Sequence, residues 1–140
     1  MKKRTTYIIS LIVITIILAF GLYFVYQLNS PKNRLIKAIA TSSEINIAEI
    51  VPFEWDTMYV FEAYTSEEKI NDTLGFESGL EGPLQDGWKL IVLTKDDKTV
   101  DSFVLKTHSQ RPNFLQNSIN ESYTRNEAIF IKEKNNFVKK

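Results

Sequence analysis

The sequence of 140 residues contains no cysteine and only one histidine, His108. Without cysteine the chain can form no disulfide and offers no thiol for lipid attachment after a signal sequence. Zinc sites of the usual kinds combine several Cys and His ligands, so we expect no metal and no cofactor. A serine–histidine–aspartate triad would have to use His108, and no G-x-S-x-G motif is present. Phosphate-binding glycine motifs are also absent.

Acidic residues are missing from residues 1–43, which carry six Lys or Arg. Residues 44–101 then carry fourteen acids against four bases, and residues 102–140 carry seven bases against three acids. The three segments therefore sum to +6, −10 and +4, which gives the net charge of zero. Without the three bases that precede the apolar run described next, the chain has a net charge of −3. Binding of nucleic acid needs a basic stripe, so we expect no nucleic-acid partner.

Charged residues are also missing from Tyr7 to Tyr26, a run of twenty residues. A helix of that length, at about 1.5 Å per residue, spans roughly 30 Å, which is the thickness of the hydrocarbon core of a bilayer. Tyr7, Tyr23 and Tyr26 lie near its ends, where tyrosine favours the headgroup level. The run predicts a transmembrane anchor over residues 7–26, preceded by a short basic segment over residues 1–6.

The alternative to an anchor is a cleavable signal peptide. Its basic start would be residues 2–4, and Ala19 and Gly21 would supply the small residues of a cleavage site. The apolar run continues through Phe20, Leu22 and Tyr23, well past that site. This continuation favours an uncleaved anchor.

The orientation of the anchor depends on the basic residues on its two sides. Residues 2–4 precede the run, and Lys32, Arg34 and Lys37 follow it. The numbers of basic residues on the two sides are therefore nearly balanced. The first group directly abuts the run, and the chain before it is very short. We therefore expect a single-pass protein of the cell membrane with residues 1–6 in the cytoplasm, a linker over residues 27–34, and an extracytoplasmic domain over residues 35–140.

Helical signals follow the anchor at two places. Ser30 is a candidate N-cap with Pro31 at the first helical position, and the apolar spacing predicts a helix that ends near residues 41–43. Residues 45–50 fit either a short strand or a loop. Further on, Thr65 and Glu68 fit a capping box, and Gly75 fits the end of that second helix.

Strand signals fill most of the remaining chain. Residues 55–64 are apolar on both faces in the middle, which predicts a central strand covered on both sides. Residues 76–87 are a loop, and residues 88–106 predict a hairpin that turns at residues 95–98. Residues 128–132 predict a last strand followed by a turn at Asn135–Asn136. This order favours an α+β domain with a largely antiparallel sheet and helices on one face.

Four polar or aromatic residues near the central strand are the candidate binding residues: Glu54, Trp55, Asp56 and Tyr64. On a strand, Glu54 and Asp56 would share one face. Paired carboxylates can do acid–base chemistry when one of them is desolvated. The simpler interpretation of Asp56 is structural, as an acceptor of several backbone amide hydrogen bonds near the strand start.

The segment from Pro52 to Gly75 resembles a pattern in small bacterial proteins, many from Gram-positive species, which carry an N-terminal membrane anchor or a lipoprotein signal. The matching residues form F-x-W-D, Y-[ST] and L-G motifs: Phe53, Trp55, Asp56, Tyr64, Thr65, Leu74 and Gly75. The chain departs from the pattern at Ala63, where proline is usual, and in lacking the lipid-attachment cysteine. The resemblance implies an anchored location and a fold, and it brings no established activity.

Two classes of function follow from these patterns. The first is a non-enzymatic, membrane-tethered exterior interaction domain that acts on a partner protein, such as an envelope protein, on the cell wall or on the envelope. The alternative is an enzyme that uses Glu54, Asp56 and Tyr64. The two classes differ in whether these residues and His108 converge in a concave pocket.

Overall fold

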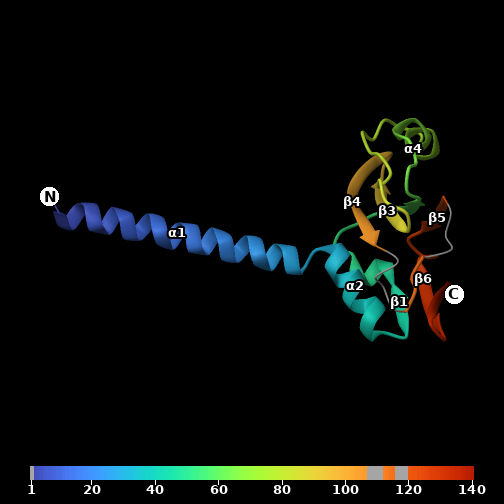
Figure 1. Cartoon of the computed structure of the whole chain (residues 1–140), viewed down its shortest axis with the longest axis horizontal. Coiled ribbons are helices and arrows are strands. Elements are labelled where there is room, and N and C mark those ends of the chain that lie inside the picture. Colours follow the sequence, from blue (N-terminus) through green and yellow to red (C-terminus); the bar gives the residue numbers. More distant parts are fainter. Residues whose placement is uncertain (1, 107–111, 116–119) are drawn as a thin grey trace.

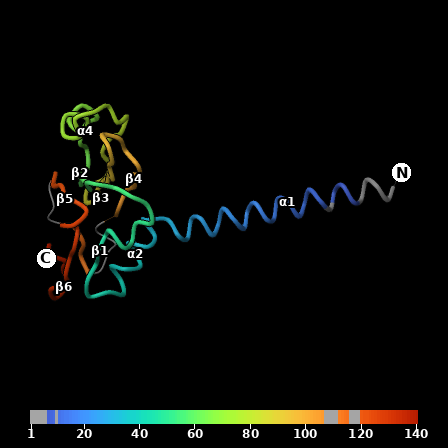
Figure 2. The backbone as a smooth tube through the Cα atoms, turned by 180° about the vertical axis from the view of Figure 1, so that it is seen from behind, coloured from blue at the N-terminus to red at the C-terminus, as the bar shows by residue number. Residues whose placement is uncertain are grey.

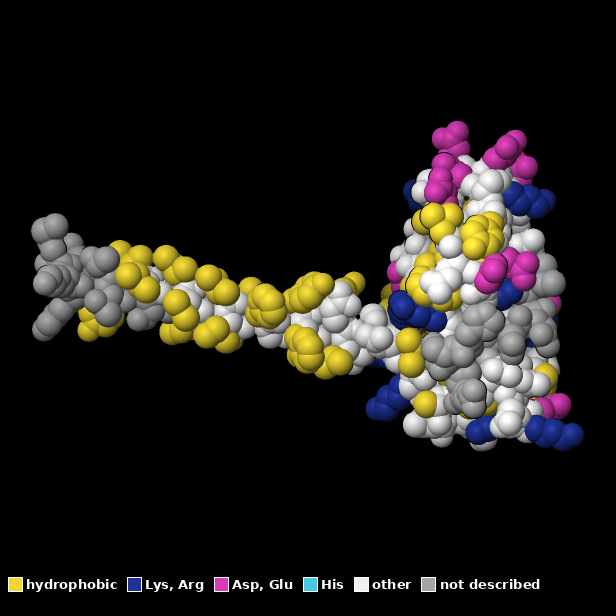
Figure 3. Space-filling view, in the orientation of Figure 1, with side chains coloured by type: hydrophobic (Ala, Val, Ile, Leu, Met, Phe, Trp, Pro, Cys, Tyr) yellow, Lys and Arg dark blue, Asp and Glu magenta, His cyan; other side chains and the backbone are white. Residues whose placement is uncertain are grey.

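The computed structural model describes residues 2–106, 112–115 and 120–140, and its first helix, α1 (Lys2–Leu28), extends alone from the rest of the chain (Figures 1 and 2). The segment Tyr7–Leu28 is long and apolar enough to cross a membrane. Apolar side chains cover α1 along most of its length (Figure 3). The predicted apolar helix is therefore confirmed, and its insertion in a membrane stays a prediction.

The second helix, α2 (Pro31–Thr41), is separated from α1 by two residues. Its cap is the predicted one, because the Ser30 side chain accepts a hydrogen bond from the backbone N–H of Asn33. Residues 31–34, which the sequence assigned to a linker, are thus part of the helix. Leu35 and Ile39 lie one turn apart and are both buried, as their spacing indicates.

Residues 44–50 combine a strand and one turn of helix. They form β1 (Glu44–Asn46) and α3 (Ile47–Ile50), and the Asn46 side chain caps α3 by accepting a hydrogen bond from the N–H of Ala48 at 3.0 Å. The remaining elements are β2 (Thr57–Phe61), α4 (Glu67–Leu74), β3 (Trp88–Lys95), β4 (Lys98–Lys106), β5 (Glu121–Thr124), β6 (Ile129–Glu133) and β7 (Asn136–Lys139).

The strands form two antiparallel sheets, one ordered β4-β3-β2-β5 and the other β1-β6-β7. The α+β class with antiparallel pairing is confirmed. Strands β5 and β7 were not predicted. The last turn lies at Lys134–Asn135, one residue earlier than expected, because Glu133 pairs with Asn136.

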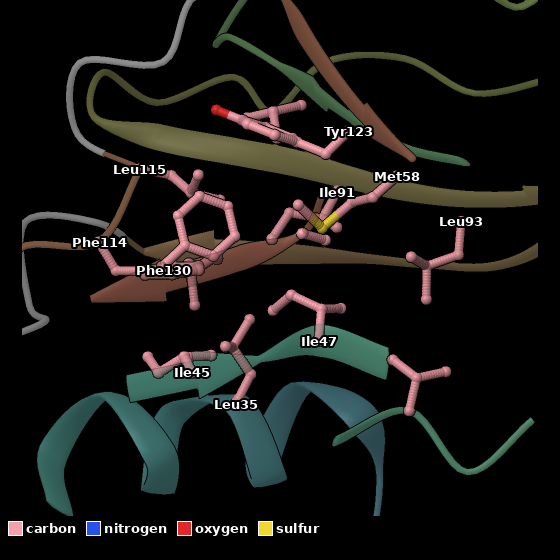
Figure 4. Packing of buried hydrophobic residues seen from close by; sticks show 14 of the residues in the cluster. Leu35, Ile45, Ile47, Met58, Ile91, Leu93, Phe114, Leu115, Tyr123 and Phe130 are labelled. Atoms are coloured by element: carbon pink, nitrogen blue, oxygen red, sulfur yellow. The ribbon is translucent and has the colours of Figure 1, made fainter. Parts of the chain in front are cut away.

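The two faces of β2 belong to different clusters of buried side chains. Met58 and Val60 lie in the larger cluster, while Phe61 lies in a smaller one with Ile70 and Leu74 of α4. Figure 4 shows the larger cluster between the sheets and α2. The prediction of a central strand covered on both sides is confirmed. The expectation of helices on one face is wrong, because α2 and α4 pack against opposite faces of the four-stranded sheet.

The β3–β4 hairpin turns through Asp96 and Asp97, whose φ angles are 50° and 55°. Two successive positive φ angles are typical of the type I′ turn, which matches the twist of the flanking strands. Aspartate tolerates this conformation better than most residues. The predicted hairpin is confirmed.

The cap of α4 differs from the prediction by one residue. Ser66 is the N-cap and accepts a hydrogen bond from the N–H of Lys69 at 3.3 Å. The capping box of Thr65 with Glu68 does not form, because the Thr65 hydroxyl donates to the carbonyl of Glu62 instead. Gly75 ends the helix with a φ of 80°, as predicted.

Candidate functional site

The four candidate residues lie at the two ends of β2. Glu54, Trp55 and Asp56 precede its first residue, and Tyr64 follows its last. The backbone of Asp56 continues the hydrogen bonding of β2 toward both neighbouring strands. Its N–H donates to the carbonyl of Thr94 at 2.7 Å, and its carbonyl accepts from the N–H of Arg125 at 2.8 Å. The first three candidates are therefore held at one end of the sheet, away from Tyr64.

The Trp55 side chain is only 1% exposed and belongs to the larger core cluster. The guanidinium of Arg125 lies 5.7 Å from the centre of its ring and donates hydrogen bonds to the carbonyls of Phe53 and Trp55 at 3.4 and 3.5 Å. The indole N–H is buried and has no hydrogen-bond partner among the described residues. Trp55 thus acts in packing, with Arg125 closing the core over it.

The two carboxylates at this end contact the β3–β4 hairpin. Glu54 forms an ion pair with Lys95, and the Asp56 side chain accepts a hydrogen bond from the N–H of Asp96 at 3.4 Å. Asp56 therefore braces the backbone, but through one long bond from an exposed side chain rather than several buried ones. Both carboxylates lie before the strand, so their predicted common strand face does not exist.

The electrostatics of Glu54 favour its charged form. The hydrogen bond and the positive charge of Lys95 lower the pKa of Glu54, and Glu54 in turn raises the pKa of Lys95. A carboxyl group that acts as a general acid near neutral pH needs a raised pKa, usually from burial. Glu54 is exposed, and its pKa moves in the opposite direction.

At the other end of β2, Tyr64 is held in an uncommon conformation. Its φ angle is 62°, and its side chain is 61% exposed. Bulky residues rarely adopt a positive φ, which costs on the order of 1–3 kcal/mol and persists only when the surroundings enforce it. Residues 62–65 form the turn that presents Tyr64, and we call it the Tyr64 turn.

Two residues of the loop between α4 and β3 are hydrogen-bonded to the Tyr64 turn. The N–H of Tyr64 donates to the carbonyl of Pro83 at 2.9 Å, and the N–H of Gly82 donates to the carbonyl of Thr65 at 2.8 Å. Gly82 is required at this crossing. A Cβ atom there would lie 2.6 Å from the backbone nitrogen of Thr65 and 2.8 Å from the carbonyl oxygen of Glu62.

Leu84 follows directly and is 80% exposed. The segment 62–87, which contains Tyr64 and Leu84, carries one base, Lys69, and seven acids: Glu62, Glu67, Glu68, Asp72, Glu77, Glu81 and Asp86. Figure 3 shows acidic side chains gathered at the end of the domain where Figure 1 places α4. Two apolar side chains thus project from a strongly negative part of the surface. We call Tyr64 and Leu84 with these acids the acidic end.

The structure brings Glu54 and Asp56 together and separates them from Tyr64, while His108 lies outside the described residues. One hollow of the described surface lies beside α4 and another at the α1–α2 joint, and neither of these is lined by Glu54, Asp56 or Tyr64. No cluster of three or more metal-binding side chains occurs in the part of the chain that the structure describes.

Leu84 was not predicted from the sequence as a surface contact. Residues 76–87 were predicted as a loop, but the contact of Gly82 and Pro83 with the Tyr64 turn joins two loops distant in sequence. Comparison of the chain with models of protein families, with curated proteins and with solved structures finds no match. The resemblance of Pro52–Gly75 to anchored bacterial proteins therefore stays a prediction, and function has to be argued from geometry.

Proposed function

We propose that the protein is a membrane-tethered, extracytoplasmic interaction domain that binds an envelope protein through its acidic end and performs no catalysis. Two features support the tether. Helix α1 carries an uncharged segment long enough to span a bilayer, and the side chains of its apolar window are not buried in the described structure. A free apolar helix of this length is stable in lipid and costly in water.

The observation that carries the binding proposal is the conformation of Tyr64. The side chain points to solvent while its backbone is held at a positive φ by the Gly82–Pro83 crossing. An exposed tyrosine gains little for the fold from this arrangement. Rigid, presented aromatic side chains are the residues that dominate binding energy at protein interfaces, because little conformational entropy is lost when they are buried by a partner.

The charge around Tyr64 and Leu84 defines the chemistry of the partner. Residues 62–87 carry seven acids against one base, and Glu62 is ion-paired with Lys89. The other six acids favour a partner surface with Lys or Arg around an apolar centre. Such a complex should form more slowly and bind less tightly as salt is raised. The alternative proposal, an enzyme that uses Glu54 and Asp56, is supported less well, because both side chains are exposed and Glu54 is ion-paired.

Site-specific crosslinking on cells tests this proposal. A photoreactive amino acid at Tyr64 or Leu84 of the full chain should give a discrete crosslinked product with one protein. The same probe at Asn126, an exposed residue beyond β5 at the other end of the sheet, serves as the control. Equal products from all three positions, or none from Tyr64 and Leu84, would reject the acidic end as the binding surface.

A further inference from the structure

The joint between α1 and α2 is fixed by hydrogen bonds rather than by a free linker. The Asn29 side chain donates to the carbonyl of Val25 at 2.9 Å, and the Asn33 side chain donates to the carbonyl of Gln27 at 2.7 Å. These bonds use carbonyls of the last turn of α1, which also accept from the backbone N–H groups of Asn29 and Ser30. Asn29 and Ser30 alone separate the two helices. The domain is therefore held directly against the end of α1.

A groove of about 540 Å³ lies at this joint, between the end of α1, the start of α2 and strand β4. Tyr26 contributes to one wall, and Val100 and Phe103 of β4 contribute to another. Val100 is 41% exposed. Ser30 and Lys32 place a hydroxyl and an ammonium group at the same groove. The lining thus combines an apolar surface with a cation and a hydrogen-bond donor.

The position of the groove relative to the bilayer follows from the joint between α1 and α2. Tyr26 belongs to the candidate span Tyr7–Leu28, and a tyrosine near the end of a span lies at the headgroup level. Because the joint has no free linker, a groove lined by Tyr26 has to stay at that level. Val100 is then placed beside lipid rather than in bulk water.

The lining chemistry matches a phospholipid at that depth. Lysine binds phosphate as a point charge, and the hydroxyl of Ser30 can donate to a phosphate oxygen. Asp101 also lines the groove and would repel a phosphate when ionised. Burial raises the pKa of Asp101, against a smaller opposing effect of the N–H of Ser102.

We propose that this groove binds the phosphodiester headgroup of a bilayer phospholipid, with Lys32 and Ser30 on the phosphate and with Tyr26, Val100 and Phe103 against the glycerol and upper acyl region. The proposal rests on α1 being the membrane anchor, as proposed above, and it is independent of the binding surface at the acidic end. The bound lipid would fix the rotation of the domain about the axis of α1.

The natural absence of cysteine allows a direct test with single spin labels. The full chain is reconstituted in phosphatidylglycerol–phosphatidylcholine nanodiscs with one label at Ile17→Cys, Val100→Cys or Thr73→Cys. The label at Val100 should be shielded from a water-soluble relaxation agent at headgroup depth, and the label at Thr73 on α4 should be fully accessible. Shielding at Ile17 with full access at Val100 would overturn the groove proposal alone, whereas access at Ile17 would overturn the anchor.

Lipid retention tests the role of Lys32. Native mass spectrometry of the full chain from mixed micelles should show retained phosphatidylglycerol, and Lys32→Gln should reduce the retained fraction about fivefold, the factor expected for one lysine at an anionic surface. Lys37→Gln on the same helix is the matched control and should change it little. Equal retention in both variants, equal retention of a phosphate-free glycolipid, or displacement by inorganic phosphate would contradict the proposal.

Discussion

The backbone and the side chain of Tyr64 serve different roles. The fold imposes the backbone conformation, and the exposed ring is the part that we propose contacts a partner. Its backbone conformation is unfavourable for a bulky side chain, and the fold enforces it through hydrogen bonds to Gly82 and Pro83. Residues that adopt the left-handed region at low cost, such as Asn and Gly, would serve the fold equally well or better. The presence of a tyrosine is best explained by what its exposed ring contacts.

This account predicts that Tyr64→Asn leaves the protein as stable as the wild type or raises its stability by up to about 1 kcal/mol, because Asn tolerates the left-handed conformation. The same variant should lose crosslinking from a photoreactive residue placed at Leu84. Thermal unfolding of the full chain in detergent gives the first quantity, and crosslinking on cells gives the second. A large loss of stability in Tyr64→Asn would show instead that the ring supports the fold.

Glu54 and Lys95 form a local electrostatic contact whose pH dependence can be stated. Lys95 lowers the pKa of Glu54 in the folded state, so the stabilisation is present above the unfolded pKa and is lost as pH falls through the folded pKa. Glu54→Gln should therefore be slightly less stable than the wild type at neutral pH and equal to it in strong acid. Unfolding measured at several pH values and at low salt checks this. A difference between the two proteins that persists in strong acid would contradict the ion-pair assignment.

At the scale of elements, the crossing of two loops positions the binding surface. The Tyr64 turn follows β2, and the Gly82–Pro83 segment leads toward β3, its neighbour in the sheet. The two segments approach so closely that only glycine fits at residue 82. This crossing brings the backbone of Tyr64 next to Pro83, which directly precedes Leu84, and it joins the two loops by hydrogen bonds.

The substitution Gly82→Ala should therefore lower the free energy of unfolding by about 1–3 kcal/mol, as overpacking of a tight site does. The added methyl group would meet backbone atoms of Thr65 and Glu62, which cannot move aside as a flexible side chain can. Leu84→Ala, two residues away and exposed, should change stability by less than about 0.5 kcal/mol. Chemical denaturation of the full chain measures both variants. Equal stability of Gly82→Ala and the wild type would show that the crossing is loose.

The elements that sequence predicted well are those with strong local signals. The β3–β4 hairpin has alternating apolar residues and a turn of two aspartates, and α2 has a serine cap followed by proline. Strand β5 was missed because only Tyr123 of its four residues is buried. The α4 cap was misplaced by one residue because Thr65 and Ser66 are both good caps, and only the contact of Thr65 with Glu62 decides between them.

The candidate site was predicted less completely than the fold. Tyr64 was identified from sequence, but its positive φ and its distance from Asp56 depend on where β2 begins and ends. Trp55 was treated as a contact residue, and its burial under Arg125 results from a pairing with β5 that local sequence does not reveal. The exposure of Leu84 depends on the loop crossing, which is a contact between distant segments.

At the scale of the whole molecule, the arrangement is an apolar helix rigidly joined to a small domain whose negative end presents two apolar side chains. In the proposed arrangement the joint would keep the domain at the bilayer surface. The acidic end is built from the Tyr64 turn, α4 and the loop that follows α4 (Figures 1 and 3). A partner of this surface would have to lie in the same membrane or in the adjoining envelope. The proposed function therefore depends first on the side of the membrane on which the domain lies.

The measurement that tests this central claim most directly is cysteine labelling of Thr73→Cys in the full chain on intact cells. Thr73 is exposed on α4, and the chain has no other cysteine to react. The account predicts that a membrane-impermeant maleimide labels this position on whole cells as strongly as after lysis, with the protein retained in the membrane fraction. Labelling only after lysis, or release of the domain into the medium, would contradict the account.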